Sequence, residues 1–411
     1  TYTVEEVAGT DATVSYDNMV ATIKVEVKHD GTTMTTVVNM LQDAPDKEFN
    51  NTVKPPEEPK FNPEKYVVSK EKFDITGMKL VDDDAELKDK VGDTNKDPYA
   101  DSTANNEAEN INTKTLKKGD KFVYQVWLDT NNFTDAHNIQ SVGVTDKYDS
   151  ENLNINVADI KAYDSVTGED VTAKFDIKVE NGVITATSKS DLTKSLGDAE
   201  NTQVIDTAKL AFGRYYKFDI PATIKGTAKD GVDIENTASQ IVHQYDPTKK
   251  SVEKPEKPTE KRVNSVPVPL EFNYTKKLEG RELTAGEFSF VLKDKDNKVL
   301  QTVTNDKDGH IKFEKLLFNK DDLGKTFTYT VEEVAGKDAS ITYDTMKATV
   351  TVKVTKEGKV LTTVVNHAST GGFASSANDK EFNNKVRPPE TPEFNPEKYI
   401  PVSYTHLRAH E

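Results

Sequence analysis

Apolar and polar residues alternate along many short segments of this chain. Val350, Val352 and Val354 are separated by threonine and lysine, and residues 23–27 show the same pattern. Alternation with a period of two is typical of a β-strand that has one buried face. Further β-branched or aromatic runs lie at residues 122–127, 288–291 and 327–331, with turn signals at residues 180–182, 295–298 and 305–309. Turns at intervals of about ten residues predict an all-β fold of tandem Ig-like β-sandwich domains.

A long internal repeat sets the domain organisation. Residues 1–27 return as residues 328–354, with 18 of the 27 positions identical. The sequence DKEFNN at 46–51 recurs at 379–384, and FNPEKY at 61–66 recurs at 394–399, so the second copy carries a six-residue insertion near residues 371–376. The chain therefore starts partway through one repeat, crosses a different domain and then contains the repeat complete. Alternating domains of this kind are typical of stalks.

Segments rich in proline, lysine and glutamate separate these pieces and predict extended, semi-rigid linkers. The expected organisation is the C-terminal part of a repeat (1–53), a linker (54–64), a middle domain (65–247), a second linker (248–266), a complete repeat (267–388) and a linker with a tail (389–411), the domains being joined by these Pro-rich linkers. The tail departs from the repeat after residue 399 and looks like translated adapter sequence. The chain does not begin with methionine, so we expect it to be a segment of a longer protein.

Composition excludes several classes of function. Lys and Arg total 54 against 70 Asp and Glu, a net charge of −16, which disfavours nucleic acid and anionic membranes as partners. The chain has no cysteine, so neither a disulfide nor a thiolate is available. No apolar run approaches the length of a membrane-spanning helix. Phosphate-binding loops and nucleophile elbows are missing from the sequence, so we expect no enzyme of these kinds.

Three strands of the complete repeat carry an ionisable or amide residue in phase with their apolar face. Alternate residues of a strand share one face, and burying a lone charge costs several kcal/mol, roughly, unless it is paired or neutralised. The residues in phase are Lys276 after Phe272 and Tyr274, Glu333 after Tyr329 and Val331, and Asn384 after Phe382.

These three residues allow two interpretations. One is a buried ion pair with an asparagine partner, or strand ends that reach water. The other interpretation is a chemical reaction between the lysine and the asparagine. Burial favours the neutral amine of a lysine and the acid form of a glutamate, and such an amine could attack a neighbouring asparagine amide, release ammonia and form an isopeptide bond. The fold would supply the effective concentration that this slow reaction needs.

The segments FNYTK (272–276), YTVEE (329–333) and EFNN (381–384) resemble the FctA-type streptococcal pilin isopeptide repeat. The resemblance covers residues 267–385 and implies that Lys276 and Asn384 are crosslinked with Glu333 as the catalytic acid. The truncated first copy supplies Glu6 and Asn51 at the matching positions. Its lysine would lie before residue 1, so this copy is not expected to close its bond.

The middle domain resembles the C-terminal isopeptide-forming domains of antigen I/II adhesins. The segments that carry the resemblance are GDKFVYQVWLDTNNF (119–133), SVGVTDKYD (141–149), DSVTGEDVTAKFDI (164–177) and DIENTASQ (233–240). Strand phase places Asp146 and Asn236 on inner faces, which implies the same bond with Asp146 as the catalytic residue. The opening PEKYVVS favours Lys65 as the nucleophile, and Lys70, in the opposite phase, is the alternative.

We therefore expect a stalk segment of a Gram-positive cell-wall adhesin, extracellular and anchored through sortase. Its ligand, on a host or another bacterium, would be bound mostly by parts outside this segment. A sortase-polymerised pilus backbone subunit and the spacer domains of a secreted surface enzyme are the alternatives. No cofactor is expected. The acidic residues 82–84 and 93–97 offer calcium as an alternative, but they lack the glycine and the distal glutamate of a calcium loop.

Overall fold

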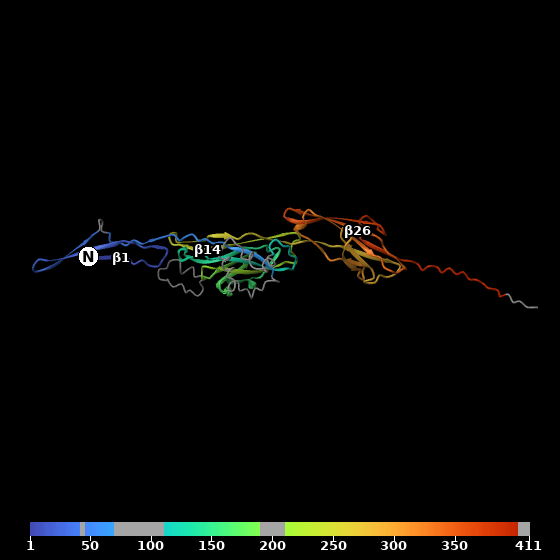
Figure 1. The fold of residues 1–411 in the computed structure, drawn as a ribbon, viewed down its shortest axis with the longest axis horizontal. Coiled ribbons are helices and arrows are strands. Elements are labelled where there is room, and N and C mark those ends of the chain that lie inside the picture. The colour runs from blue at the N-terminus through green and yellow to red at the C-terminus, as the bar shows by residue number, and fades with distance from the viewer. Residues whose placement is uncertain (42–45, 70–110, 190–209, 402–411) are drawn as a thin grey trace, which may run out of the picture. The chain divides into compact units, whose positions relative to one another are not determined.

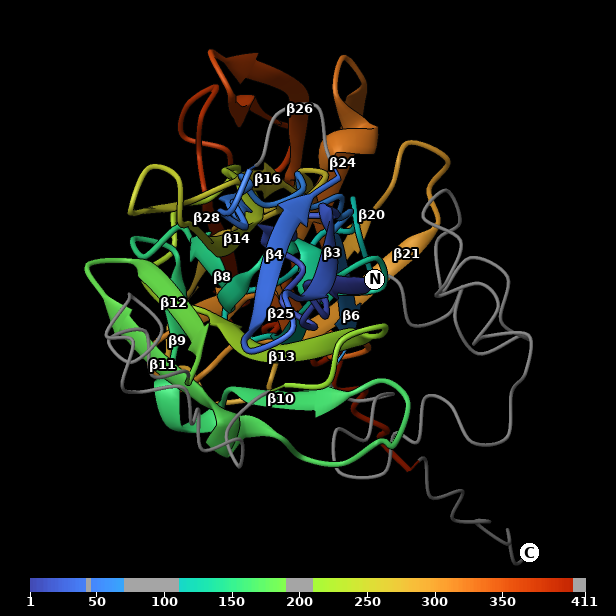
Figure 2. The same ribbon diagram turned by 90° about the vertical axis from the view of Figure 1, so that its left-hand side faces the viewer.

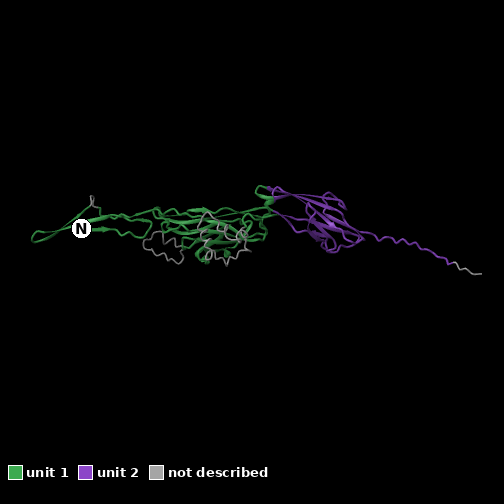
Figure 3. Ribbon diagram, in the orientation of Figure 1, with its two compact units in different colours: residues 1–268, 319–321, 357–361 green, residues 269–318, 322–356, 362–411 purple. Residues whose placement is uncertain are grey.

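The computed structural model describes residues 1–41, 46–69, 111–189 and 210–401 (Figure 1). Regular structure in these ranges consists of β-strands and single turns of 3₁₀ helix at η1 (Asp135–His137), η2 (Val157–Asp159), η3 (Thr172–Lys174) and η5 (Lys320–Asp322). The fold is all-β, as the alternation predicts. No helix among the described residues has the length and apolar character needed to cross a membrane. Figure 3 colours two compact units, which divide near Val268.

The N-terminal repeat fragment forms two small antiparallel sheets. Three strands pair in the order β1 (Tyr2–Glu5), β3 (Val20–His29) and β4 (Met34–Met40). The other sheet joins β2 (Val14–Ser15) to β5 (Thr52–Val53). Several apolar side chains of the fragment are exposed, among them Tyr2, Val4 and Val38.

The middle domain is built from two sheets. The first has the order β10 (Lys161–Asp164), β13 (Tyr215–Ile224), β7 (Lys121–Asp129) and β6 (Glu64–Ser69), with β9 (Leu153–Ile155) also paired to β13. The second has the order β11 (Phe175–Glu180), β12 (Val183–Ser188), β8 (Ile139–Lys147) and β14 (Asp233–Asp246). Figure 2 labels strands of both sheets, including β13 and β14.

The core of this domain lies between the inner faces of the two sheets. Val126 and Phe218 from the first sheet and Val144, Ile184 and Ala238 from the second belong to one cluster of buried side chains. Burial alternates strictly along β14, as expected for a strand with one face in a core. This packing makes the domain a β-sandwich.

The structure differs from the free spacer expected at residues 248–266. This segment forms β15 (Ser251–Glu253), β16 (Glu256–Pro258) and β17 (Arg262–Ser265), which all pair antiparallel with β14. The extended conformation that proline favours is close to that of a strand. Residues between the prolines still carry N–H groups, so the segment can pair with the open edge of β14.

The first linker also packs on the middle domain. Phe61 lies edge-to-face with Phe133 at 6.0 Å between ring centroids, and Pro59 and Pro63 are buried. The Gln244 side chain donates a hydrogen bond to the Glu57 carbonyl. Residues 54–64 are therefore anchored to the middle domain at several positions, while others, such as Lys54, Glu58 and Lys60, are exposed.

The complete repeat contains a five-stranded sheet and a four-stranded sheet. The first has the order β21 (Val299–Thr304), β20 (Ser289–Lys293), β24 (Thr326–Val334), β26 (Lys347–Glu357) and β27 (Val360–Thr370). The second has the order β22 (His310–Lys312), β19 (Asn273–Glu279), β28 (Glu381–Val386) and β25 (Ile341–Thr342). The short strands β18 (Val268–Leu270) and β23 (Leu316–Phe318) pair with each other.

Aromatic side chains join these two sheets. Phe382 on β28 lies 5.2 Å from Phe290 on β20, and Phe272, just before β19, lies 5.6 Å from Tyr329 on β24, measured between ring centroids. The pairing of β19 with β28 is parallel. It places an early strand of the repeat beside its last strand at the centre of the four-stranded sheet.

Candidate functional site

The structure brings Lys276, Glu333 and Asn384 of the complete repeat together. Lys276 Nζ lies 2.7 Å from Glu333 Oε2, and Asn384 Nδ2 donates a 2.6 Å hydrogen bond to Glu333 Oε1. The side chains of Lys276 and Glu333 are 0% exposed. One buried carboxylate thus bridges an amine and an amide, which is the arrangement that strand phase predicts for these positions.

Backbone pairing positions the amine and the amide. In the parallel register Leu278 lies opposite Asn384, so Lys276 is two residues away on the same face. Gly309 closes the turn beside this strand and accepts the Lys276 N–H at 2.7 Å. Its φ is +82°, and a Cβ there would come within 2.3 Å of the Lys276 carbonyl oxygen, so only glycine fits this close approach.

Asp344 holds the amide of Asn384 from the other side. Its backbone N–H donates a 2.7 Å hydrogen bond to Asn384 Oδ1. Its buried carboxylate accepts the backbone N–H groups of Met346, Phe373 and Asn383. A fixed N–H donor on the amide oxygen would stabilise the negative charge that develops there during nucleophilic attack.

Burial shifts both titrating groups of the site toward their neutral forms. Desolvation lowers the pKa of Lys276, although the charge of Glu333 opposes this. Desolvation likewise raises the pKa of Glu333, against the opposing charge of Lys276. Phe288 adds an aromatic face 4.6 Å from Lys276 Nζ. These shifts reduce the cost of moving a proton from the amine to the carboxylate.

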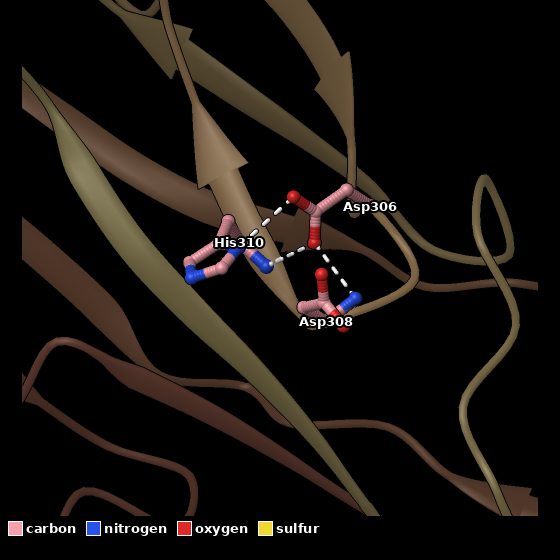
Figure 4. A group of neighbouring side chains, drawn as sticks. All are labelled: Asp306, Asp308 and His310. Atoms are coloured by element: carbon pink, nitrogen blue, oxygen red, sulfur yellow. Dashed lines mark hydrogen bonds and ion pairs between the residues drawn. The ribbon is translucent and has the colours of Figure 1, made fainter.

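An exposed acidic turn lies at residues 306–310 of the complete repeat, next to β19 (Figure 4). Asp306 accepts hydrogen bonds from the backbone N–H groups of Asp308 and His310, and its carboxylate also lies 2.9 Å from His310 Nδ1. These bonds close the turn that leads into β22, and β22 pairs with the lysine-bearing strand. These hydrogen bonds explain why Asp306, Asp308 and His310 lie close together: the three residues form a turn that has a structural role.

The middle domain contains a second buried lysine–carboxylate pair. Lys65 Nζ lies 2.5 Å from Asp146 Oδ2, and both side chains are 0% exposed. Asn236 is also buried. Ala238 lies opposite Asp146 in the antiparallel register. Asn236 is two residues before Ala238 and therefore lies on the same face of the sheet as Asp146. Within the described residues the Asn236 amide and Asp146 Oδ1 make no hydrogen bond of good geometry.

Two residues around Lys65 have roles that strand phase did not predict. The ring of Tyr124 lies 4.6 Å from Lys65 Nζ, and burial and the charge of Asp146 raise the pKa of this tyrosine. Arg262 on β17 donates a 2.5 Å hydrogen bond to the Lys65 carbonyl. The pKa of Lys65 is lowered mainly by burial, with the charge of Arg262 contributing.

Some predicted residues fall outside the part of the chain that the structure describes. Lys70, the alternative nucleophile, is one of them, as are the acidic residues 82–84 and 93–97 considered for calcium. In the truncated first copy, Asn51 Nδ2 donates to Glu6 Oε1 at 2.7 Å, and Asp17 N–H donates to Asn51 Oδ1 at 2.8 Å. This copy therefore holds its amide in the same way as the complete repeat.

Comparison with known proteins identifies two domain families. Residues 98–255 match the cell surface antigen I/II C2 terminal domain, and residues 272–387 match the Spy0128-like isopeptide containing domain of the FctA family. A curated relative, aggregation substance of Enterococcus faecalis, is 27% identical over 154 residues, which cover 33% of this chain and 11% of the relative. The chain thus spans about a tenth of the length of that relative.

Solved pilin structures are also similar to the chain. BcpA, the major pilin subunit of Bacillus cereus, is 15% identical with a TM-score of 0.33, over 93% of this chain and 83% of that one. The 35 kDa C-terminal fragment of GBS80, the major pilin of Streptococcus agalactiae, is 13% identical with a TM-score of 0.31, over 66% and 96% of the two chains.

The two family matches show which domain types residues 98–255 and 272–387 are similar to. The chain combines an antigen I/II C-terminal-type domain with an FctA-type isopeptide-containing domain. These families place it outside the cell, at the cell surface.

Proposed function

We propose that this chain is a stalk segment of a cell-wall-anchored adhesin of a Gram-positive bacterium, stabilised by intramolecular Lys–Asn isopeptide bonds. Lys276 bonds to Asn384 with Glu333 as the catalytic residue, and Lys65 bonds to Asn236 with Asp146 in that role. The observation that carries the proposal is the buried Glu333 carboxylate, which contacts the amine at 2.7 Å and the amide at 2.6 Å. The family matches supply the surface context.

The chemistry follows from the contacts of Glu333. The carboxylate takes a proton from the Lys276 ammonium, and the neutral amine attacks Cγ of Asn384. The backbone N–H of Asp344 stabilises the oxygen that gains charge. Glu333 then delivers this proton to the departing amide nitrogen, which leaves as ammonia, and accepts the second proton that the Lys276 nitrogen loses as it becomes an amide. The reaction is intramolecular and occurs once, so the protein acts on itself and is not an enzyme for an external substrate.

The partners of the proposed stalk would be bound mostly by parts of the longer protein outside these domains. Sortase would anchor the longer protein to the cell wall, and a host or bacterial surface ligand would be bound elsewhere on it. The segment itself needs no cofactor for this role, because the carboxylate and the fold supply the chemistry.

Intact-mass measurement of the whole chain tests the crosslinks. We expect each of these two crosslinks to remove one ammonia, with peptide mapping assigning one loss to Lys276–Asn384 and one to Lys65–Asn236. Glu333→Ala should retain the fold and lose only the first crosslink. Glu332→Ala is the matched control, because its side chain pairs with Lys293 and Lys347 instead. A full unmodified mass in well-folded protein would contradict the proposal.

A further inference from the structure

A third buried group of lysine, carboxylate and amide lies in the middle domain, on the opposite face of the sheet from Lys65. Lys217 and Asp219 are on β13, and Gln125 is on the neighbouring strand β7. Lys217 is 1% exposed, while Asp219 and Gln125 are both 0% exposed. They alternate with Phe218 and Ile220, which belong to the core cluster, so this group lies on the other face of the sheet.

The distance from lysine to carboxylate and the offset from lysine to amide in this group resemble those of the Lys276 site, although Asp219 lies on the same strand as its lysine. Lys217 Nζ lies 2.8 Å from Asp219 Oδ2, close to the 2.7 Å between Lys276 and Glu333. Asp219 lies opposite Gln125, so the lysine and the amide are offset by two residues on one face of neighbouring strands. Lys276 and Asn384 show the same offset, although their strands are parallel.

The surroundings of Lys217 favour its neutral amine. Desolvation lowers the pKa of Lys217 and raises that of Asp219, as it does for Lys276 and Glu333. The ring of Tyr163 lies 4.9 Å from Lys217 Nζ. Gln125 is close enough to lower the pKa of Asp219, yet within the described residues its amide makes no hydrogen bond of ordinary geometry. A buried amide without such a bond is costly to keep.

We propose that Lys217 and Gln125 form a third intramolecular amide crosslink, which joins β13 to β7, with Asp219 as the catalytic residue. The bond from Lys217 Nζ to Gln125 Cδ forms as the bond from Cδ to Nε2 breaks. Asp219 takes a proton from the lysine and delivers it to Nε2, which departs as ammonia. No oxidant or other reactant is needed. The crosslink shares its chemistry with the proposed function but involves none of the same residues.

Mass and peptide mapping of the full-length chain test this crosslink directly. The expected result is the loss of one ammonia beyond those from Lys65 and Lys276, together with a linked peptide pair that contains Lys217 and Gln125. Lys217→Arg keeps the positive charge and should abolish only this pair. Lys161→Arg is the control, because Lys161 lies on the adjacent strand β10 and its side chain is 43% exposed. Its ammonia loss should equal that of the unchanged chain.

The unchanged chain decides the question even if the variant at residue 217 fails to fold. Recovery of Lys217 and Gln125 in separate, unmodified peptides overturns the inference, whatever the state of the other crosslinks. If Lys217 and Gln125 are linked while Lys276 and Asn384 are not, the third crosslink stands and the proposed function fails. The two proposals therefore fail separately.

Discussion

At the scale of single residues, the Lys276–Glu333 pair gives the uncrosslinked repeat a pH dependence of defined sign. Burial lowers the pKa of Lys276 below 10.5 and raises that of Glu333 above 4.5. Between its lowered pKa and 10.5, Lys276 binds fewer protons in the folded state than in the unfolded state, so stability rises with pH. Between 4.5 and its raised pKa, Glu333 binds more protons in the folded state, so stability falls as pH rises.

An Asn384→Ala variant should show both effects, because Lys276 cannot form the isopeptide bond in this variant and keeps its titrating amine. We expect the contribution of the pair to the free energy of unfolding to be lowest between these two pH ranges. Urea unfolding of this variant is measured across pH and compared with a second variant that also carries Lys276→Met and Glu333→Gln. The second variant lacks both titrating groups, so the difference between the two free energies of unfolding is the contribution of the pair. A maximum in place of the minimum would show that the pair is stabilising when charged.

Strand phase predicted the placement of residues wherever a strand has one buried face. Lys276, Glu333 and Asn384 follow alternating apolar residues, so their inward direction could be predicted. Lys217 and Gln125 could not be found in this way, because strand phase places them on the face opposite the core-facing residues, and in β13 and β7 that face is buried as well. Asp344 acts on Asn384 through its backbone N–H, which sequence pattern does not reveal.

At the scale of elements, the proline-rich segment after the middle domain is part of that domain. Its composition predicted a free spacer, but the segment pairs with β14, because the open edge of that strand offers unpaired backbone N–H and C=O groups. Its last strand, β17, carries Arg262 to the Lys65 carbonyl. The boundary expected at residue 247 therefore lies too early, because pairing with β14 continues to Ser265.

Removing the Arg262 side chain should slow the Lys65–Asn236 reaction. Arg262→Ala loses a hydrogen bond that positions Lys65 and a nearby positive charge that favours its neutral amine. We expect a lower rate of ammonia loss from the middle domain after synthesis in a cell-free system, followed by mass spectrometry over time. Lys261→Ala is the control, because Lys261 pairs with the partly exposed Glu235. Equal rates in both variants would show that β17 plays no part in positioning Lys65.

At the scale of the whole molecule, the crosslinks should determine how the domains respond to tension. A bond between Lys276 and Asn384 excludes nearly the whole repeat from extension, because force passes from β19 to the neighbouring β28. By analogy with a disulfide across a loop of this size, the bond would also stabilise the repeat by about 4–5 kcal/mol.

Single-molecule pulling on the full chain, with handles at its two ends, measures the mechanical effect. We expect no unfolding step of domain length from the middle domain or the complete repeat in the unchanged chain. The variant with both Glu333→Ala and Asp146→Ala should show two steps, and the Lys217–Gln125 crosslink should shorten the step of the middle domain. A chain with its crosslinks intact that extends as far as this variant would remove the mechanical basis of the stalk.

The amine, carboxylate and amide of the complete repeat come from three strands that are widely separated in sequence and meet only after the sandwich has closed. Ammonia would diffuse away once it is released, so the proposed bond would not reverse when the chain later loosens. The mass of each molecule would therefore keep a permanent record of whether its repeat once folded correctly. Chains taken from a cell surface long after folding could be separated by mass into those whose repeat had folded and those whose repeat had misfolded, because a misfolded copy would remain heavier by one ammonia.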